Sequence, residues 1–236
     1  MQRMGIIGAM DTEVDNLIGR MENTTVTEYA GRKFVCGTLS GKDAVVVQSG
    51  IGKVAAAITA QMLIDRFQVT ALLNTGMAGG LDSRLQVKDL VVATDAVQHD
   101  FDLTAFGHVR GFLFGEDDSK PTRFLCDPVL VEKALTAAAA VLPADNKAIT
   151  GTVASGDIFV DDGGLKAAIR DNFSAAATEM EGAAIAQTAA ANGIPFVILR
   201  TISDLAEGGA KVSFDELERY VGQLAGDITV ALLANL

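Results

Sequence analysis

Strand-like and helix-like segments alternate along almost the whole chain, and this alternation limits the fold more than any other feature of the sequence. Short apolar stretches end at glycine or serine turns. The segments that follow them repeat apolar residues every three to four positions, which is the spacing of one helix face. Such chains form layers of helices packed on a sheet. The sequence therefore predicts an α/β fold, a three-layer α/β/α sandwich with a central mixed, mostly parallel sheet.

Three closely spaced strands near the start of the chain are expected to form a meander, which makes the sheet mixed. No linker, repeat or charge run divides the chain, so we expect a single domain over residues 1–236. Strands are expected over 3–8, 24–30, 33–39, 43–48, 69–74, 89–97, 147–154, 175–178 and 197–202. Helices are expected over 11–21, 54–67, 128–142, 164–171, 181–192 and 214–235.

Two stretches between these elements are expected to be irregular. The glycine-rich segment 76–80 follows a strand and is predicted to be a turn. Residues 99–122 show little periodicity and are predicted to be a long loop, which in compact domains is often functional. Two helix starts are clear: Asp127-Pro128 combines a capping acid with a proline at the first helical position, and residues 213–216 form a capping box.

The composition excludes several classes of partner. There are 19 basic and 30 acidic side chains and a net charge of −11, whereas nucleic acids and anionic membranes bind clustered Lys and Arg. We expect neither partner. No apolar run approaches the roughly 18 residues that span a bilayer, and the short one at the N-terminus is followed at once by acids, as in a first strand. Cys36 and Cys126 stand alone, which is typical of buried thiols in the cytoplasm.

No cofactor or metal site is recognisable in the sequence. With two cysteines and two histidines there is no spacing typical of zinc ligands, so we expect no divalent metal requirement. The glycines of residues 5–8 and 50–53 match neither the dinucleotide fingerprint nor the phosphate-binding loop. We therefore expect no bound nucleotide cofactor.

The turns after the predicted strands are small, apolar or acidic, and Lys53 and Arg200 are almost the only basic residues near them. Ligands of α/β sheets bind at the carboxyl ends of strands, so these turns are where a site is expected. Three carboxylates there are candidates for chemistry: Glu13, Glu181 and Asp204.

Each of these carboxylates also has a structural interpretation. Glu13 and Glu181 lie in the first turn of a predicted helix, where the helix dipole favours acids, and Asp204 fits a solvated loop. Together, however, carboxylates in different environments can divide acid and base roles, as in glycoside cleavage. The pattern alone indicates hydrolysis of an N- or O-glycoside and leaves the choice open.

Several longer motifs resemble a known family. In chain order they are GIIGAM-x-x-E, SGIGKVAAA, NTG-x-AGGL, HD-x-D-x-TAFG, SGD-x-F, EMEG-AIA, R-x-ISD and SFDE. They extend from residue 3 to about 220 and resemble the 5′-methylthioadenosine/S-adenosylhomocysteine nucleosidases. These belong to the purine nucleoside phosphorylase/uridine phosphorylase superfamily.

The resemblance implies the nucleoside phosphorylase-like sandwich, a homodimer, and hydrolysis of the C1′–N9 bond of adenosine thioethers to adenine and a 5-thio-substituted ribose. It implies that Glu13 activates water, that Glu181 holds ribose hydroxyls and that Asp204 is the acid at adenine N7. A loop around Phe106 and His108 would reach into the neighbouring subunit's pocket. The other substrate contacts implied are Met10, Ile51, Met77, Ala78, Gly79, Phe159, Val160, Met180, Arg200, Ser203 and Phe214.

The chemistry adds two expectations. An exposed Asp is ionised at neutral pH, so Asp204 is expected in a site that favours its protonated form or lets it share a proton with the bound base, with Ser203 orienting it. An acidic pocket poor in basic residues suits a cationic, oxocarbenium-like transition state.

Two other functions stay open. A purine nucleoside phosphorylase is one, although relatives that use phosphate carry arginine in a G-D-P-x-R turn where this chain has Glu13. A non-catalytic nucleoside-binding or storage protein is the other. The family often has Ser where this chain has Met77, and loop 107–121 follows no pattern of the family, so the preferred 5′-substituent is open; 5′-deoxyadenosine and aminodeoxyfutalosine are further candidates.

Overall fold

The computed structural model of the chain describes residues 3–115, 117–205 and 214–236. Its helices and strands lie close to the predicted ranges. The strands are β1 (Met4–Gly8), β2 (Glu22–Tyr29), β3 (Arg32–Leu39), β4 (Lys42–Gln48), β5 (Ala71–Gly80), β6 (Leu90–Gln98), β7 (Phe124–Leu125), β8 (Ala148–Ser155), β9 (Ala175–Glu179) and β10 (Phe196–Leu205). The helices are α1 (Asp11–Ile18), α2 (Lys53–Phe67), α3 (Pro128–Val141), α4 (Gly163–Phe173), α5 (Gly182–Ala191) and α6 (Phe214–Ala234).

The strands form one mixed sheet, as predicted. Parallel pairing joins β4, β1, β5 and β10 in that order, and also joins β6, β8 and β9. The meander β2–β3–β4 is antiparallel, as are the pairs β10–β6 and β5–β9. Because β5 pairs with both β9 and β10, the strands β5, β10, β6, β8 and β9 form a closed ring, which the sequence did not predict.

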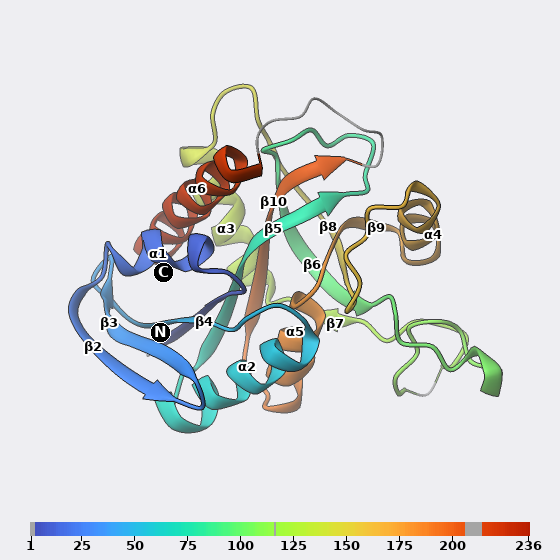
Figure 1. Cartoon of the computed structure of the whole chain (residues 1–236), viewed down its shortest axis with the longest axis horizontal. Helices are drawn as coiled ribbons and strands as arrows, with labels where there is room; N and C mark the ends of the chain where they lie inside the picture. The colour runs from blue at the N-terminus through green and yellow to red at the C-terminus, as the bar shows by residue number, and fades with distance from the viewer. Residues whose placement is uncertain (1–2, 116, 206–213) are drawn as a thin grey trace.

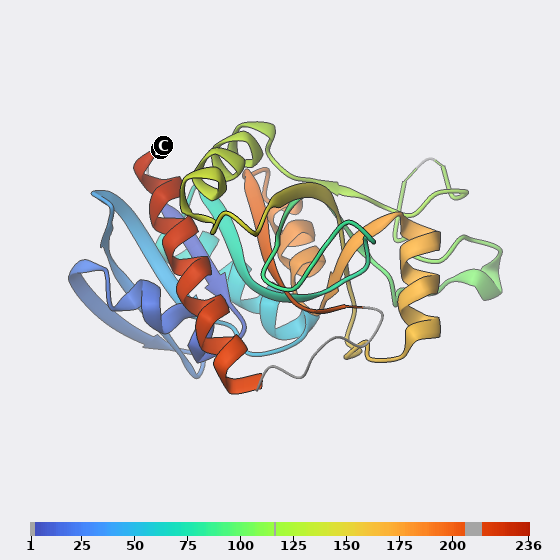
Figure 2. The same cartoon turned by 90° about the horizontal axis from the view of Figure 1, so that it is seen from above.

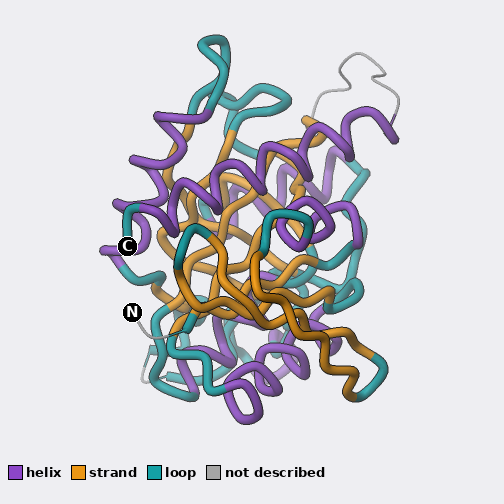
Figure 3. Tube along the Cα trace, turned by 90° about the vertical axis from the view of Figure 1, so that its left-hand side faces the viewer, coloured by secondary structure: helices purple, strands orange, loops and turns teal. Residues whose placement is uncertain are grey.

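Helices cover both faces of the sheet, which confirms the layered α/β architecture (Figures 1 and 3). On β1 the side chain of Ile7 packs in the core under α2 and α5, whereas Ile6 packs in the core under α1, α3 and α6. This two-residue alternation is the reason why a short apolar strand supports two cores. Helix α6 crosses the strands diagonally in Figure 2 and contacts α1 and α3.

The glycine-rich segment 76–80 is not a turn but the end of β5, and this prediction was wrong. It pairs in parallel with β10, from Gly76 opposite Arg200 to Gly80 opposite Leu205. Glycine is needed at 76 for space, because a Cβ atom there would collide with the side chains of Arg200 and Glu13. A β-bulge between Ile202 and Asp204 shifts the register at the end of β10.

The predicted long loop is confirmed between β6 and β7, where the described residues contain only a short 3₁₀ turn, Thr104–Phe106. This segment extends away from the sheet, to the right in Figures 1 and 2. The predicted cap of α3 is also present, since Asp127 Oδ1 accepts hydrogen bonds from the amides of Val129 and Leu130 at 3.0 and 2.9 Å. The capping box of the last helix lies partly outside the described residues. Among the described helices, none is both long and apolar enough to cross a membrane.

Candidate active site

A cavity of about 330 Å³ opens where strands of the sheet end. Its walls come from the carboxyl ends of β1, β4, β5, β8, β9 and β10, which is the position expected for a ligand site in an α/β fold. One helix residue from the far end of the chain, Leu217 of α6, completes it. The lining residues are Ala9, Met10, Glu13, Ile51, Met77, Ala78, Gly79, Ile158, Phe159, Val160, Thr178, Glu179, Met180, Glu181, Ser203, Asp204 and Leu217.

Most of the predicted site residues meet in this cavity. All three candidate carboxylates line it. The predicted substrate contacts that line it are Met10, Ile51, Met77, Ala78, Gly79, Phe159, Val160, Met180 and Ser203. Phe214 is the first residue of α6, and its side chain lies outside the described part of the structure.

Glu13 is buried in the cavity because the loop after β1 wraps around it. Its residue surface is 3% exposed, and its Oε2 accepts hydrogen bonds from the amides of Ala9 and Met10 at 2.6 and 3.1 Å. Its Oε1 accepts one from the amide of Met77 at 3.1 Å. Burial raises the pKa of Glu13, an effect that the charge of Arg200 and these amides oppose. The result is a fixed carboxylate with an increased affinity for a proton.

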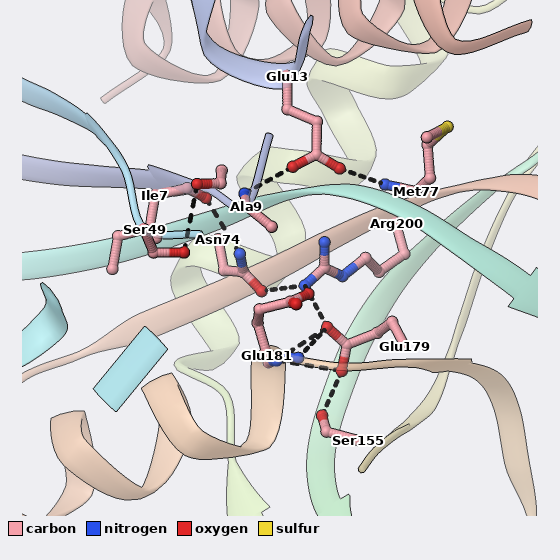
Figure 4. A network of polar contacts seen from close by, with 12 residues as sticks. Ile7, Ala9, Glu13, Ser49, Asn74, Met77, Ser155, Glu179, Glu181 and Arg200 are labelled. Atoms are coloured by element: carbon pink, nitrogen blue, oxygen red, sulfur yellow. Dashed lines mark hydrogen bonds and ion pairs between the residues drawn. The ribbon is translucent and has the colours of Figure 1, made fainter. Parts of the chain in front are cut away.

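Glu179 and Arg200 form a buried ion pair behind the cavity (Figure 4). Glu179 also accepts hydrogen bonds from the Ser155 hydroxyl and, at 2.8 to 3.1 Å, from the amides of residues 181 and 182 at the start of α5. A helix N-terminus favours such a negative group. Arg200 in turn donates to Asn74. The pair thus ties β5, β8, β9, β10 and α5 together under the site.

Arg200 therefore differs from its expected role as a substrate contact. It is 1% exposed and does not line the cavity; its guanidinium lies beneath three carboxylates, those of Glu13, Glu179 and Glu181. The positive charge of the guanidinium compensates part of the negative charge of the three carboxylates. We call Glu13, Glu179 and Glu181 the acidic floor.

Glu181 is the N-cap residue of α5. The helix therefore begins at Gly182, one position after the predicted start at residue 181. Its Oε1 accepts a hydrogen bond from the amide of Gly52 at 2.9 Å, and its Oε2 lies 3.5 Å from Arg200 Nη2. Burial, together with the charge of Glu179, raises the pKa of Glu181 to about 7. The acidic floor thus holds a group that takes up or releases a proton near neutral pH.

Asp204 occupies a different environment on the wall of the cavity. Its side chain is 47% exposed, and its Oδ1 accepts a hydrogen bond from Ser203 Oγ at 2.9 Å, which is the orienting contact predicted for Ser203. Its Oδ2 lies 2.7 Å from Lys166 Nζ. Surroundings that favour the protonated form, one of the two predicted alternatives, are therefore not found, because an ammonium group pairs with this carboxylate. Sharing of a proton with the bound base stays a prediction. The lining of the cavity itself includes no Lys or Arg among the described residues.

The mouth of the cavity is apolar and exposed. Ile51, Ile158 and Phe159, which we call the apolar rim, are 60%, 45% and 72% exposed. Large exposed apolar side chains that gather at an opening are typical of a binding surface.

Phe106 and His108 lie on the extended loop and do not line this chain's cavity. Phe106 is 79% exposed, while the His108 ring stacks on Phe112 and its Nδ1 lies 3.4 Å from Asp118 Oδ2. The proposed contact with a neighbouring subunit stays a prediction.

Sequence reasoning missed three polar groups of the site: Glu179, Lys166 and Asn74. Glu179 stands in the EMEG motif two positions before Glu181 and was recognisable as a fourth acid at a strand end. Lys166 carried a weaker signal, a charge on the apolar face of a predicted helix. Asn74 looked like an ordinary strand residue, and only the fold shows that its amide bridges Arg200 to the carbonyl of Ile7.

Comparison with known proteins identifies the family of the chain. The family model described as Phosphorylase superfamily matches residues 3–235. A 5′-methylthioadenosine/S-adenosylhomocysteine nucleosidase of Shewanella halifaxensis is 41% identical over 235 residues, which cover 99% of this chain and 100% of the relative. The chain belongs to the nucleosidase family of this superfamily. The resemblance found in the sequence motifs is thereby confirmed.

Solved structures of nucleosidases agree with this membership. The crystal structure of the Campylobacter jejuni 5′-methylthioadenosine/S-adenosylhomocysteine nucleosidase superimposes with a TM-score of 0.92 at 33% identity, and the match covers 100% of both chains. The Colwellia psychrerythraea nucleosidase, solved in complex with adenine, gives a TM-score of 0.89 at 41% identity and covers 100% of this chain and 96% of that one. The match extends over the whole nucleosidase fold, including every strand end that lines the cavity.

Proposed function

We propose that this chain hydrolyses the N-glycosidic bond of 5′-methylthioadenosine and S-adenosylhomocysteine, and also that of 5′-deoxyadenosine. The products are adenine and the corresponding ribose, which carries a 5-thio substituent for the first two substrates. The observation that carries this proposal is the cavity itself, in which a buried acidic floor and a half-exposed Asp204 face one apolar-lined space. Carboxylates in such different environments are suited to separate acid and base roles.

Asp204 is the acid of the proposed reaction. It gives a proton to N7 of adenine while the C1′–N9 bond breaks and its electron pair moves into the base. Adenine then leaves as a neutral molecule. The position of Asp204 on the wall, held by Ser203 and lying over the backbone of Gly79, suits a group that approaches the edge of a flat ring.

Glu13 is the base that takes a proton from the attacking water. Three backbone amides fix both of its oxygens, and burial raises its pKa, so the carboxylate is positioned and has an increased affinity for a proton. Water then adds to C1′ as the oxocarbenium-like sugar forms.

Glu181 binds the ribose hydroxyl groups. As an acceptor on the acidic floor it places negative charge close to the sugar, where the transition state becomes positive. Met180 and Met77 form apolar walls beside the sugar, and Phe159 and Val160 contact the adenine.

The same electrostatics disfavour phosphorolysis. Phosphate would have to approach Glu13 in a cavity whose described lining contains no basic side chain. A purine nucleoside phosphorylase would need a cationic anion site at this place. A non-catalytic binding protein would have no use for Glu13 as a buried carboxylate with a raised pKa.

We propose that the 5′-substituent of the bound substrate extends out of the cavity past the apolar rim. Met10, Ile51 and Leu217 present no charge to it, which suits a methylthio group. The described structure offers no basic side chain in the lining for the carboxylate of a homocysteine tail, so that tail would extend into solvent.

We propose that the active form is a homodimer in the cytoplasm. Val54 and Ile58 on α2 are 69% and 43% exposed and continue the apolar rim from Ile51, which gives an exposed apolar stripe of the kind that subunits cover. The loop with Phe106 and His108 would then contribute to the neighbouring subunit's pocket. The cytoplasm is supported by the two free cysteines, Cys36 and Cys126, which form no disulfide.

Product analysis tests the proposed function. Purified protein is incubated with 5′-methylthioadenosine in the presence and absence of phosphate, and products are separated by chromatography. We expect adenine and free methylthioribose at equal rates in both cases. Formation of a sugar 1-phosphate only when phosphate is present would instead establish a phosphorylase.

A further inference from the structure

A lysine occupies the buried face of α4, where the helix pattern calls for an apolar residue. Lys166 is 4% exposed and shares this face with Ile169 and Phe173, three and seven positions later. These two residues belong to a core with residues of β8 and β9. Lysine is rarely buried to this extent unless its charge is paired, because removal of an ammonium group from water is unfavourable.

The ammonium group of Lys166 reaches the wall of the active site. Its Nζ lies 2.7 Å from Oδ2 of Asp204, while Ser203 holds Oδ1 at 2.9 Å. The carboxylate is thus held at both oxygens. It also lies directly over the backbone of Gly79, where an added Cβ would be 3.4 Å from Oδ2. Lys166 itself does not line the cavity.

We propose that Lys166 is a positioning residue for the acid of the reaction. It fixes the Asp204 carboxylate against Gly79 and stabilises the negative charge that remains on it after the proton has moved to the base. This inference rests on the proposed function of Asp204. Proton transfer to N7 of adenine then depends on a pair of side chains, Lys166 of α4 and Asp204 of β10, rather than on Asp204 alone.

The balance of the step explains why an ammonium group helps. Before transfer Asp204 carries the proton, taken up from solvent when the substrate binds. During transfer the proton goes to N7, the C1′–N9 electron pair goes to the ring, and Asp204 becomes an anion. A cation in hydrogen-bond contact with Oδ2 stabilises this anion more than the neutral acid, so it stabilises the transition state relative to the bound substrate. The observed ion pair is that of the ionised carboxylate, the form of Asp204 both before it takes up the proton and after it has given the proton to the base.

The test compares kcat and KM of Lys166→Met, Lys166→Arg and the wild type with 5′-methylthioadenosine. We expect Lys166→Met to lower kcat roughly tenfold to a hundredfold, within the range of proton-transfer catalysis, and to leave KM within about twofold. Lys166→Arg keeps the charge and the donor, so it should restore part of kcat. Lys147→Met serves as the matched control, because Lys147 also faces a buried aspartate, Asp89, but at the other end of β8.

Two further readouts separate positioning from a structural role. Methionine suits the apolar face of α4, so Lys166→Met should melt at or above the temperature of the wild type. In an Asp204→Asn background, Lys166→Met should cause little further loss of the residual turnover, because the group through which it acts is gone.

The inference is overturned by kcat of Lys166→Met within twofold of the wild type. It is also overturned by a loss of equal size in the Asp204→Asn background, or by a loss that only follows a lower melting temperature. Failure of the wild type to release adenine from 5′-methylthioadenosine would instead overturn the proposed function, so the two failures are distinguishable.

Discussion

On the acidic floor, Glu13, Glu179 and Glu181 are each less than a tenth exposed, and hydrogen bonds from amides, hydroxyls or a guanidinium hold them in place. On the wall and the apolar rim, by contrast, the Asp204 side chain is half-exposed and Phe159 is largely so. Floor groups therefore contribute to stability as well as to the reaction. Rim groups can be changed with little effect on folding, so their substitutions report on function alone, whereas Asp204 on the wall also pairs with the buried Lys166.

The largest effect is expected on the wall. Asp204→Asn removes the transferable proton and should lower kcat by roughly 10³-fold, within the range of general acid catalysis. The melting temperature should also fall, because the buried ammonium group of Lys166 loses its charged partner. Kinetics with 5′-methylthioadenosine measure kcat, and calorimetry with adenine measures whether the variant still binds the base. Asp171→Asn, an exposed aspartate of α4, is the control. Near-normal kcat would remove Asp204 from the acid role.

Behind the floor the main effect should be on folding. Arg200→Met leaves the buried carboxylates of Glu179 and Glu181 without their cation, and we expect the free energy of unfolding to fall by about 3–5 kcal/mol. Urea denaturation measures it, with the exposed Arg66→Met as the control. A loss below about 1 kcal/mol would show that the floor is not held together by this charge.

Glu13→Gln should affect both properties. The amide cannot take a proton from water, so kcat should fall by roughly 10²-fold, and its NH₂ group would oppose a backbone amide, which lowers stability by about 1 kcal/mol. Turnover and thermal melting are compared with Asp11→Asn, an exposed acid of the same helix turn. Full activity would point to another base.

The raised pKa of Glu181 predicts a pH dependence of stability. In the folded chain Glu181 holds a proton up to about pH 7, whereas in the unfolded chain it loses the proton near its usual value of 4.5. Its contribution to stability is thus present below about pH 4.5 and is lost as the pH rises to 7, by at most about 1.4 kcal/mol per pH unit. Glu181→Gln should remove this dependence. Identical pH profiles of unfolding for both proteins would contradict the assignment.

The smallest effect is expected at the rim. Phe159→Ala removes a ring proposed to stack on adenine, which should raise KM about tenfold, corresponding to about 1.4 kcal/mol, with no loss of stability. Phe159→Tyr keeps the ring and should behave like the wild type. An unchanged KM in the alanine variant would place adenine elsewhere in the cavity.

The contrast between floor and wall also explains what the sequence could predict. The spacing of apolar residues predicted the helices and strands. This worked because burial alone fixes that spacing in elements such as β1 and α6. The acids at strand ends followed from the rule that ligand sites form there. Glu13, Glu181 and Asp204 were therefore found without knowledge of their contacts.

The remaining features depend on contacts between distant segments. Residues 76–80 look like a turn, but pairing with β10 extends them, and Gly76 makes room for Arg200 and Glu13. The closed ring of strands requires two partners for β5, which no local pattern encodes. For the same reason the ion pair between Lys166 and Asp204, 38 positions apart, appears only in the fold.

The measurement that tests the central claim most directly is the fate of the water oxygen. The wild type is incubated with 5′-methylthioadenosine and phosphate in H₂¹⁸O, and the sugar is trapped by reduction and analysed by mass spectrometry. We predict one ¹⁸O atom at C1 of methylthioribose and no sugar phosphate. A sugar 1-phosphate without ¹⁸O at C1 would contradict hydrolysis by a water molecule held at Glu13.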